Sequence, residues 1–143
     1  MNRYLLDTHA LIGLITGKDE HLPKHIREDI ESYSNLYFVS VASFVEMIDK
    51  QRKKTDVIVP GTPEEWKSLL EQWNIGIVEL TYDIVRRFHR EGIPESQIMQ
   101  HKDPFDRLII STALTEKMTL ISADRKFPWW QRYRRLSLVY FGH

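Results

Sequence analysis

The chain has no cysteine among its 143 residues. Disulfides and thiolate metal sites are therefore excluded, and the composition suits a reducing compartment, so we expect a cytoplasmic location. The chain also lacks an apolar run near the ~20 residues that a membrane-spanning helix needs, so no membrane association is expected. No signal-peptide pattern, internal repeat or low-complexity segment is found. We expect a single domain spanning residues 1–143.

The formal net charge is zero, but the charges are unevenly distributed. No acid follows Asp124, whereas five cations do: Arg125, Lys126, Arg132, Arg134 and Arg135. Aromatic side chains lie between them, and binding of nucleic acid uses stacking and phosphate contacts together, so this tail favours a nucleic acid partner. Basic blocks at 50–54 and 86–90 fit either a phosphate-binding surface or solvated helix ends, where a cation contributes roughly 0.3–1 kcal/mol.

Short apolar runs alternate with segments of helical periodicity along the chain. The runs predict strands at 3–6, 36–39, 77–80, 118–121 and 136–141. Capping residues predict the starts of six helices: Asp7, Pro23, Ser40, Thr62, Thr81 and Asp103. For the helix at 41–53 we expect a buried stripe formed by Val41, Phe44, Val45 and Ile48. The alternation indicates an α/β sandwich around a mainly parallel sheet.

Three acids lie where α/β proteins usually place their chemistry. Asp7 follows a predicted strand and begins a helix, Asp106 lies in the first turn of a helix, and Asp124 lies just past a strand. Each also has a simpler interpretation, as a cap, a helix-dipole partner or a turn residue. Because the carboxyl ends of parallel strands meet, we expect the acids to converge and repel one another. A hard divalent cation, Mg²⁺ or Mn²⁺, would relieve that repulsion.

Four segments together resemble a known family. Residues 4–11 read Y-L-L-D-T-H-A-L, 39–47 read V-S-V-A-S-F-V-E-M, 101–108 read H-K-D-P-F-D-R-L and 120–124 read L-I-S-A-D. In this order and spacing they resemble the successive motifs of PIN-domain nucleases, most closely the VapC-type toxins of prokaryotic toxin–antitoxin pairs. The resemblance spans residue 3 to about 125.

The resemblance implies a three-layer α/β/α sandwich and metal-dependent cleavage of RNA. It implies a catalytic, Mg²⁺- or Mn²⁺-binding set of acids: Asp7, Glu46, Asp106 and Asp124. Thr8 and Ser122 match hydroxyl positions beside these acids. The family pattern also implies a cognate antitoxin and a homodimer. From the residues alone Glu46 carries no such role, because an ion pair with Lys50 or a chance capping-box match with Ser43 explains it equally well.

Other interpretations stay open for several residues. Five cations are candidate RNA contacts: Lys53, Arg107, Arg125, Lys126 and Arg132. His9 and His101 lie near the acids in sequence and have either a chemical or a structural role. A phosphoryl-accepting receiver domain would also place acids at strand ends, but it needs a lysine ending a later strand, and the strand before Asp124 ends without one. A catalytically silent PIN fold that binds RNA or a protein partner is the main alternative to the nuclease.

Overall fold

A computed structural model describes residues 1–18, 22–53, 58–90, 103–124, 127–128, 131 and 136–142. In this part of the chain a parallel sheet has the strand order β3-β2-β1-β4-β5. The strands are β1 (Arg3–Leu6), β2 (Leu36–Ser40), β3 (Gly76–Val78), β4 (Thr119–Ser122) and β5 (Leu138–Tyr140). The helices are α1 (Thr8–Thr16), α2 (Lys24–Ser32), α3 (Val41–Lys53), α4 (Pro63–Gln72), α5 (Tyr82–Arg90) and α6 (Pro104–Glu116).

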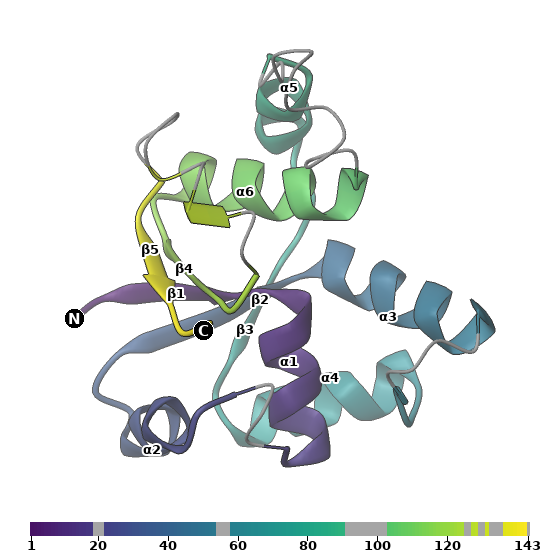
Figure 1. Cartoon of the computed structure of the whole chain (residues 1–143), viewed down its shortest axis with the longest axis vertical. Helices are drawn as coiled ribbons and strands as arrows, with labels where there is room; N and C mark the ends of the chain where they lie inside the picture. Colours follow the sequence, from purple (N-terminus) through teal and green to yellow (C-terminus); the bar gives the residue numbers. More distant parts are fainter. Residues whose placement is uncertain are drawn as a thin grey trace.

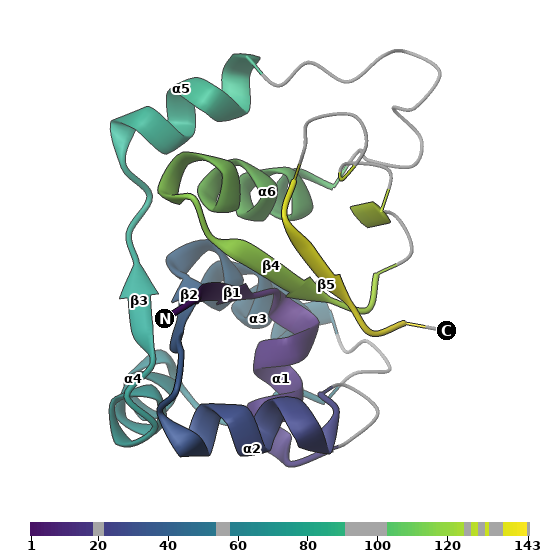
Figure 2. The ribbon, with the colours of Figure 1, turned by 90° about the vertical axis from the view of Figure 1, so that its left-hand side faces the viewer.

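Helices cover both faces of the sheet. In Figures 1 and 2, α5 and α6 lie on one side of the strands, and α1, α2 and α4 lie on the other. The expected α/β/α sandwich with a parallel sheet is thus confirmed. In the described ranges no helix has the length and apolar character that crossing a membrane requires.

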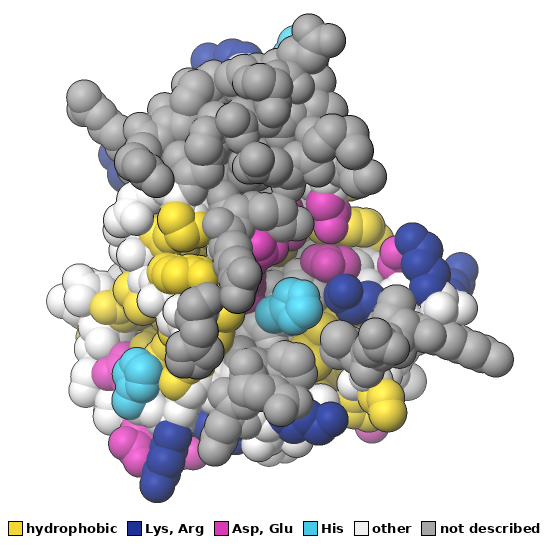
Figure 3. Space-filling view, in the orientation of Figure 1, with side chains coloured by type: hydrophobic (Ala, Val, Ile, Leu, Met, Phe, Trp, Pro, Cys, Tyr) yellow, Lys and Arg dark blue, Asp and Glu magenta, His cyan; other side chains and the backbone are white. Residues whose placement is uncertain are grey.

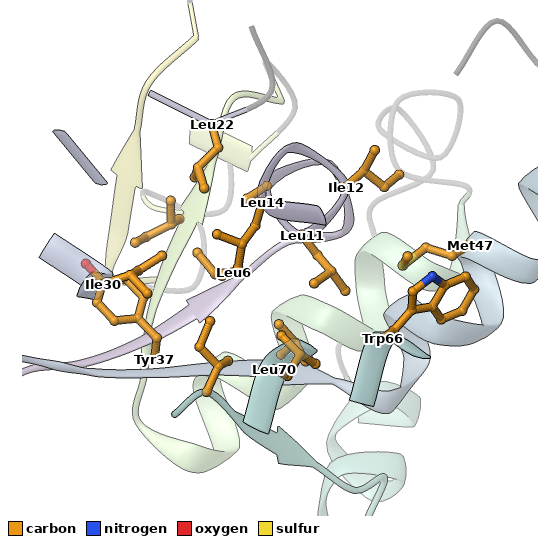
Figure 4. Close-up of a cluster of buried hydrophobic side chains, with 14 of the residues drawn as sticks. Leu6, Leu11, Ile12, Leu14, Leu22, Ile30, Tyr37, Met47, Trp66 and Leu70 are labelled. Atoms are coloured by element: carbon orange, nitrogen blue, oxygen red, sulfur yellow. The ribbon is translucent and has the colours of Figure 1, made fainter. Parts of the chain in front are cut away.

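Successive strand residues point to opposite faces, and each face has its own core. Leu6 and Ile121 pack in a cluster with α1, α2, α3 and α4, part of which is drawn in Figure 4. Leu5 and Leu120 pack in a second cluster with α6. Trp66 is fully buried in the first cluster, where its indole N–H donates to the Pro60 carbonyl at 2.8 Å. The sheet is therefore fixed from both sides, which holds the ends of its strands in place.

Side-chain caps begin the helices as the sequence predicts. The Asp7 carboxylate accepts from the Ala10 N–H at 2.7 Å, and Asp103 accepts from Phe105 at 2.9 Å. The hydroxyl groups of three further caps accept from backbone N–H groups of their helices: Ser40, Thr62 and Thr81. Each such cap contributes about 1 kcal/mol to its helix. The predicted start of α2 is also confirmed, since Pro23 directly precedes it.

The structure corrects the stripe predicted for α3. Val45 is 51% exposed, whereas Met47 is fully buried. The helix buries the apolar Ala42, Phe44 and Met47, and the polar Ser43 and Glu46 are buried between them around the helix. A pattern of apolar residues cannot reveal a face that buries polar side chains. The buried face of α3 therefore lies elsewhere around the helix axis than predicted.

Two strands are shorter than predicted, and one begins earlier. The strand predicted at 136–141 is β5, which spans Leu138–Tyr140, and the one predicted at 77–80 is β3, which spans Gly76–Val78. A Cβ atom on Gly76 would lie 2.8 Å from the Phe38 ring, so glycine is needed for this close approach of β3 to β2. The sequence also predicts that Gly92 and Pro94 stop the helix that begins after Thr81, and that 125–135 form a loop or short helix. The first of these segments, and most of the second, lie outside the described residues.

Candidate functional site

The four predicted acids line one pocket at the carboxyl edge of the sheet. Asp7 follows β1, and Asp124 lies two residues after β4, the strand that neighbours β1. Glu46 lies on α3, which directly follows β2, and Asp106 lies in the first turn of α6. The pocket has a volume of about 100 Å³ and is lined by Asp7, Thr8, His9, Glu46, Lys50, Asp103, Asp106 and Asp124. In Figure 3 acidic side chains gather near the middle of the visible face, with a histidine beside them.

Asp7 is the most deeply embedded of these acids. Its side chain is 3% exposed, and its carboxylate accepts hydrogen bonds from the Ala10 N–H at 2.7 Å and the Ser122 hydroxyl at 2.5 Å. Burial raises the pKa of Asp7 to about 7, against the lowering effect of these two hydrogen bonds. The charges of Asp106 and Asp124 raise this pKa further, so both lie close enough to act on Asp7.

Glu46 and Lys50 enter the same pocket as an ion pair. The Lys50 ammonium lies 3.8 Å from Oε2 of Glu46, and the two side chains are only 20% and 10% exposed. The pairing expected from their four-residue spacing is therefore confirmed. The position of Lys50 inside the acid pocket was not predicted. Its spacing from Glu46 was the available signal, because a partner one turn away must lie on the same helix face.

Three hydroxyl groups lie in or beside the acid pocket. Ser122 donates to Asp7 and accepts from the Asp124 N–H at 3.0 Å, so one buried hydroxyl connects two of the acids. Thr8 lines the pocket and donates to the hydroxyl of Ser43 at 3.0 Å. Ser43 is fully buried in α3 and was not expected at the site. It lies after the cap of α3, at Ser40, so its match to a capping box was coincidental.

Comparison with known proteins identifies the family of this chain. The model of the PIN domain family matches residues 4–129. The chain belongs to the PIN domain family. Comparison with curated proteins gave no match. The resemblance inferred from the sequence motifs is thus confirmed for the family.

Solved structures share the fold of this PIN domain. A VapBC2 complex from Rickettsia felis bound to promoter DNA has 19% identity and a TM-score of 0.62, with 96% of this chain and 98% of that chain covered. A DNA-bound VapBC from Salmonella typhimurium has 18% identity and a TM-score of 0.64, with 97% and 98% covered. A toxin–antitoxin complex from Klebsiella pneumoniae has 18% identity and a TM-score of 0.60, with 98% and 99% covered.

The predicted RNA contacts of the PIN domain fall in different places. The Arg107 guanidinium lies 4.5 Å from the Phe88 ring centroid, so it connects α6 with α5 and does not line the acid pocket. Lys53 is bound to Asp49 at 2.9 Å and is 67% exposed. Arg125, Lys126 and Arg132 lie outside the described residues, as does His101. His9 does line the pocket.

The chemistry of the pocket fits a hard divalent cation. Its acids offer only oxygen donors, which Mg²⁺ and Mn²⁺ prefer. In the described part of the chain, however, no three Asp, Glu or His side chains converge closely enough to form a complete binding group. Burial is the main cause of the raised pKa of Asp7, and the charges of Asp106 and Asp124 add to it, so the acids repel one another. The acids therefore suit a divalent ion because they offer oxygen donors and line one pocket. Their role as its ligands is a prediction.

Proposed function

We propose that this PIN domain is a Mg²⁺- or Mn²⁺-dependent endoribonuclease and the toxin of a toxin–antitoxin pair. The main support is the pocket in which Asp7, Glu46, Asp106 and Asp124 meet. PIN domains are generally nucleases, and proteins that share this fold are described as VapBC or toxin–antitoxin complexes. Clustered carboxylates around a partly enclosed pocket are what metal-assisted phosphodiester hydrolysis requires.

Four side chains would hold the ion: Asp7, Glu46, Asp106 and Asp124. When bound, a divalent ion lowers the pKa of water and neutralises charge on the scissile phosphate. The chain keeps the Asp7 carboxylate in place through Ser122 and the Ala10 N–H. Water would attack phosphorus and the bond to the 3′ oxygen would break, so the products would carry a 5′-phosphate and a 3′-hydroxyl.

The proposed partners follow from the same assignment. They are an RNA substrate, a cognate antitoxin and a second copy of the chain in a homodimer, with all of them acting in the cytoplasm. Co-expression with the product of an adjacent small open reading frame tests the antitoxin. An inhibitory complex on purification supports the toxin assignment, and a neighbour that neither binds nor inhibits contradicts it.

Incubation of purified protein with RNA tests the ribonuclease itself. We expect cleavage with Mg²⁺ or Mn²⁺, none with EDTA, and a loss of at least about a thousandfold in Asp106→Asn, because the acid would act on the transition state. A matched control is Asp83→Asn, which removes the aspartate in the first turn of α5. Mapping the ends should give 5′-phosphates. Metal-independent cleavage would contradict the proposal.

One observation favours a second candidate function, a silent module that binds RNA or a protein. In the described ranges no three potential ligands form a complete metal-binding group. Such a module would bind RNA equally well in EDTA and would cleave none with any divalent metal. The incubation above therefore separates the two functions.

A further inference from the structure

A second cavity adjoins the acid pocket. It has a volume of about 550 Å³ and lies between the second half of α3 and the start of α6, lined by Glu46, Asp49, Lys50, Lys53, Asp103, Pro104 and Phe105. Glu46, Lys50 and Asp103 line both cavities. The two spaces are therefore adjacent, and we name the larger one the α3–α6 trough.

Two lysines and two acids lie along the α3 side of the trough, with Lys50 paired to Glu46 at 3.8 Å and Lys53 paired to Asp49 at 2.9 Å. Lys50 lies where the trough adjoins the acid pocket, and Lys53 follows it by about one helical turn. The hydrogen bond and charge of Asp49 raise the pKa of Lys53, and the charge of Asp103 adds to this effect. Lys53 thus lies within electrostatic reach of the opposite side of the trough, at α6.

An aromatic residue lies on the α6 side. Phe105 is half-buried and lines the trough, and its backbone N–H is held by the Asp103 carboxylate at 2.9 Å. Pro104 beside it restricts the backbone at the start of α6. The ring is therefore carried by a rigid element, and little ordering is needed when a ligand binds.

We propose that the α3–α6 trough holds the single-stranded RNA segment next to the scissile phosphate. Lys50 contacts the phosphate nearest the acid pocket, Lys53 contacts the following phosphate, and Phe105 stacks on the base between them. Proteins that bind single-stranded RNA likewise use basic side chains for phosphates and aromatic side chains for bases. The volume lies within the range of about 300–1,000 Å³ that small organic ligands occupy, which suits a nucleotide.

This assignment rests on the proposed ribonuclease function, because the trough adjoins the acid pocket. A protein segment is the alternative occupant. RNA is favoured because the trough adjoins the pocket where the phosphate would react, so a phosphate backbone would have to pass beside it. Each lysine is paired with an acid of α3, but Lys53 is 67% exposed, so its ammonium group is accessible to a phosphate.

Fluorescence anisotropy with a labelled short single-stranded RNA tests the trough. The measurement uses EDTA and an Asp106→Asn background, so that the RNA stays intact. Phe105→Leu should weaken binding at least about fivefold because stacking is lost, and Phe105→Tyr should retain it. Lys53→Ala should reduce the slope of log affinity against log salt by about 0.7, the contribution of one phosphate contact on a single strand.

A matched control is Lys24→Ala on α2. Lys24 pairs with Glu28 at 3.8 Å and four-residue spacing, as Lys50 does with Glu46, but it lies outside the trough. This variant should have an affinity and a salt slope close to those of the parent, because only one charge distant from the trough is removed. Thermal unfolding of each variant confirms that it is folded.

Cleavage by the same variants in an otherwise unchanged active chain separates two kinds of failure. We expect Phe105→Leu and Lys53→Ala to raise KM with little change in kcat. If the parent cuts RNA but the trough variants retain its KM and affinity, the trough assignment is overturned and a protein occupant is indicated. If the parent cuts no RNA with any divalent metal, the proposed function is overturned, and the trough assignment with it.

Discussion

The Ser122 hydroxyl donates to the Asp7 carboxylate at 2.5 Å, although the two residues are 115 positions apart in the sequence. This bond joins the ends of β1 and β4, which are paired neighbours in the sheet. It also favours the charged form of an acid that burial drives towards the neutral form. The bond therefore connects the fold with the electrostatics of the pocket.

Replacing Ser122 with alanine should weaken the site more than it changes the fold. The substitution removes a donor to a buried carboxylate, so the pKa of Asp7 should rise further. Loss of such a supporting hydrogen bond typically reduces metal affinity about 10- to 100-fold. Calorimetric titration with Mn²⁺ measures this change. Unchanged affinity would show that Ser122 has only a packing role.

The stability of the metal-free protein should depend on pH through Asp7. Burial raises its pKa from 3.8 to about 7. Between these values the folded protein keeps a proton that the unfolded chain has lost. The free energy of unfolding in EDTA should therefore fall as pH rises towards 7, by roughly 1.4 kcal/mol for each pKa unit of the shift.

Urea unfolding at a series of pH values measures this contribution. The contribution of protonated Asp7 to the free energy of unfolding is fully present below about pH 4. It is lost as pH rises through the pKa of Asp7 in the folded state, near 7. The difference between the parent and Asp7→Asn isolates the contribution of this residue from all other titrating groups. Parallel pH curves for the two proteins would contradict the raised pKa.

Asp106→Asn should produce a more stable protein when no metal is present. The charge of Asp106 raises the pKa of Asp7, so the two carboxylates repel each other, and the amide removes that repulsion. The substitution also removes a helix-dipole interaction of about 0.3–1 kcal/mol. Asp83→Asn removes a comparable first-turn charge on α5 without relieving the pocket. Thermal unfolding in EDTA should show a midpoint above that of the parent for Asp106→Asn. For Asp83→Asn the midpoint should not increase.

A stability determinant lies outside the acid pocket. The Tyr37 hydroxyl donates to the Asp29 carboxylate, which also accepts from Asn35 at 3.0 Å. Tyr37→Phe should lower the free energy of unfolding by about 1–2 kcal/mol, because one bond to a charged acceptor is lost while the other remains. RNA cleavage at a temperature where the variant is folded should match the parent. A large loss of activity there would show coupling between this region and the site.

Much of the fold could be predicted from local signals. Asp103-Pro104 marks the start of α6 because a side-chain cap and a proline without an N–H both suit that position. The Asp7 cap and the end of β1 were equally clear. The sequence did not reveal that Ser43 would be buried beside Thr8, since helix periodicity identifies apolar faces and not buried polar ones.

The limits of β3 depended on tertiary contact. The sequence predicts the strand from residue 77, but Gly76 begins it, where the Phe38 ring leaves no space for a side chain. Part of the candidate site also depended on tertiary contacts. The family motifs identified the acids, whereas the entry of Lys50 into their pocket depended on how α3 packs against its neighbours.

The central claim is that the four acids act together as one divalent-metal site. Calorimetric titration with Mn²⁺ near pH 7 tests it most directly, using the parent and four variants: Asp7→Asn, Glu46→Gln, Asp106→Asn and Asp124→Asn. We predict saturable binding by the parent, with release of a proton from Asp7, and an affinity at least about tenfold weaker in each variant. A parent that binds no Mn²⁺, or variants that all bind it as the parent does, would contradict the account.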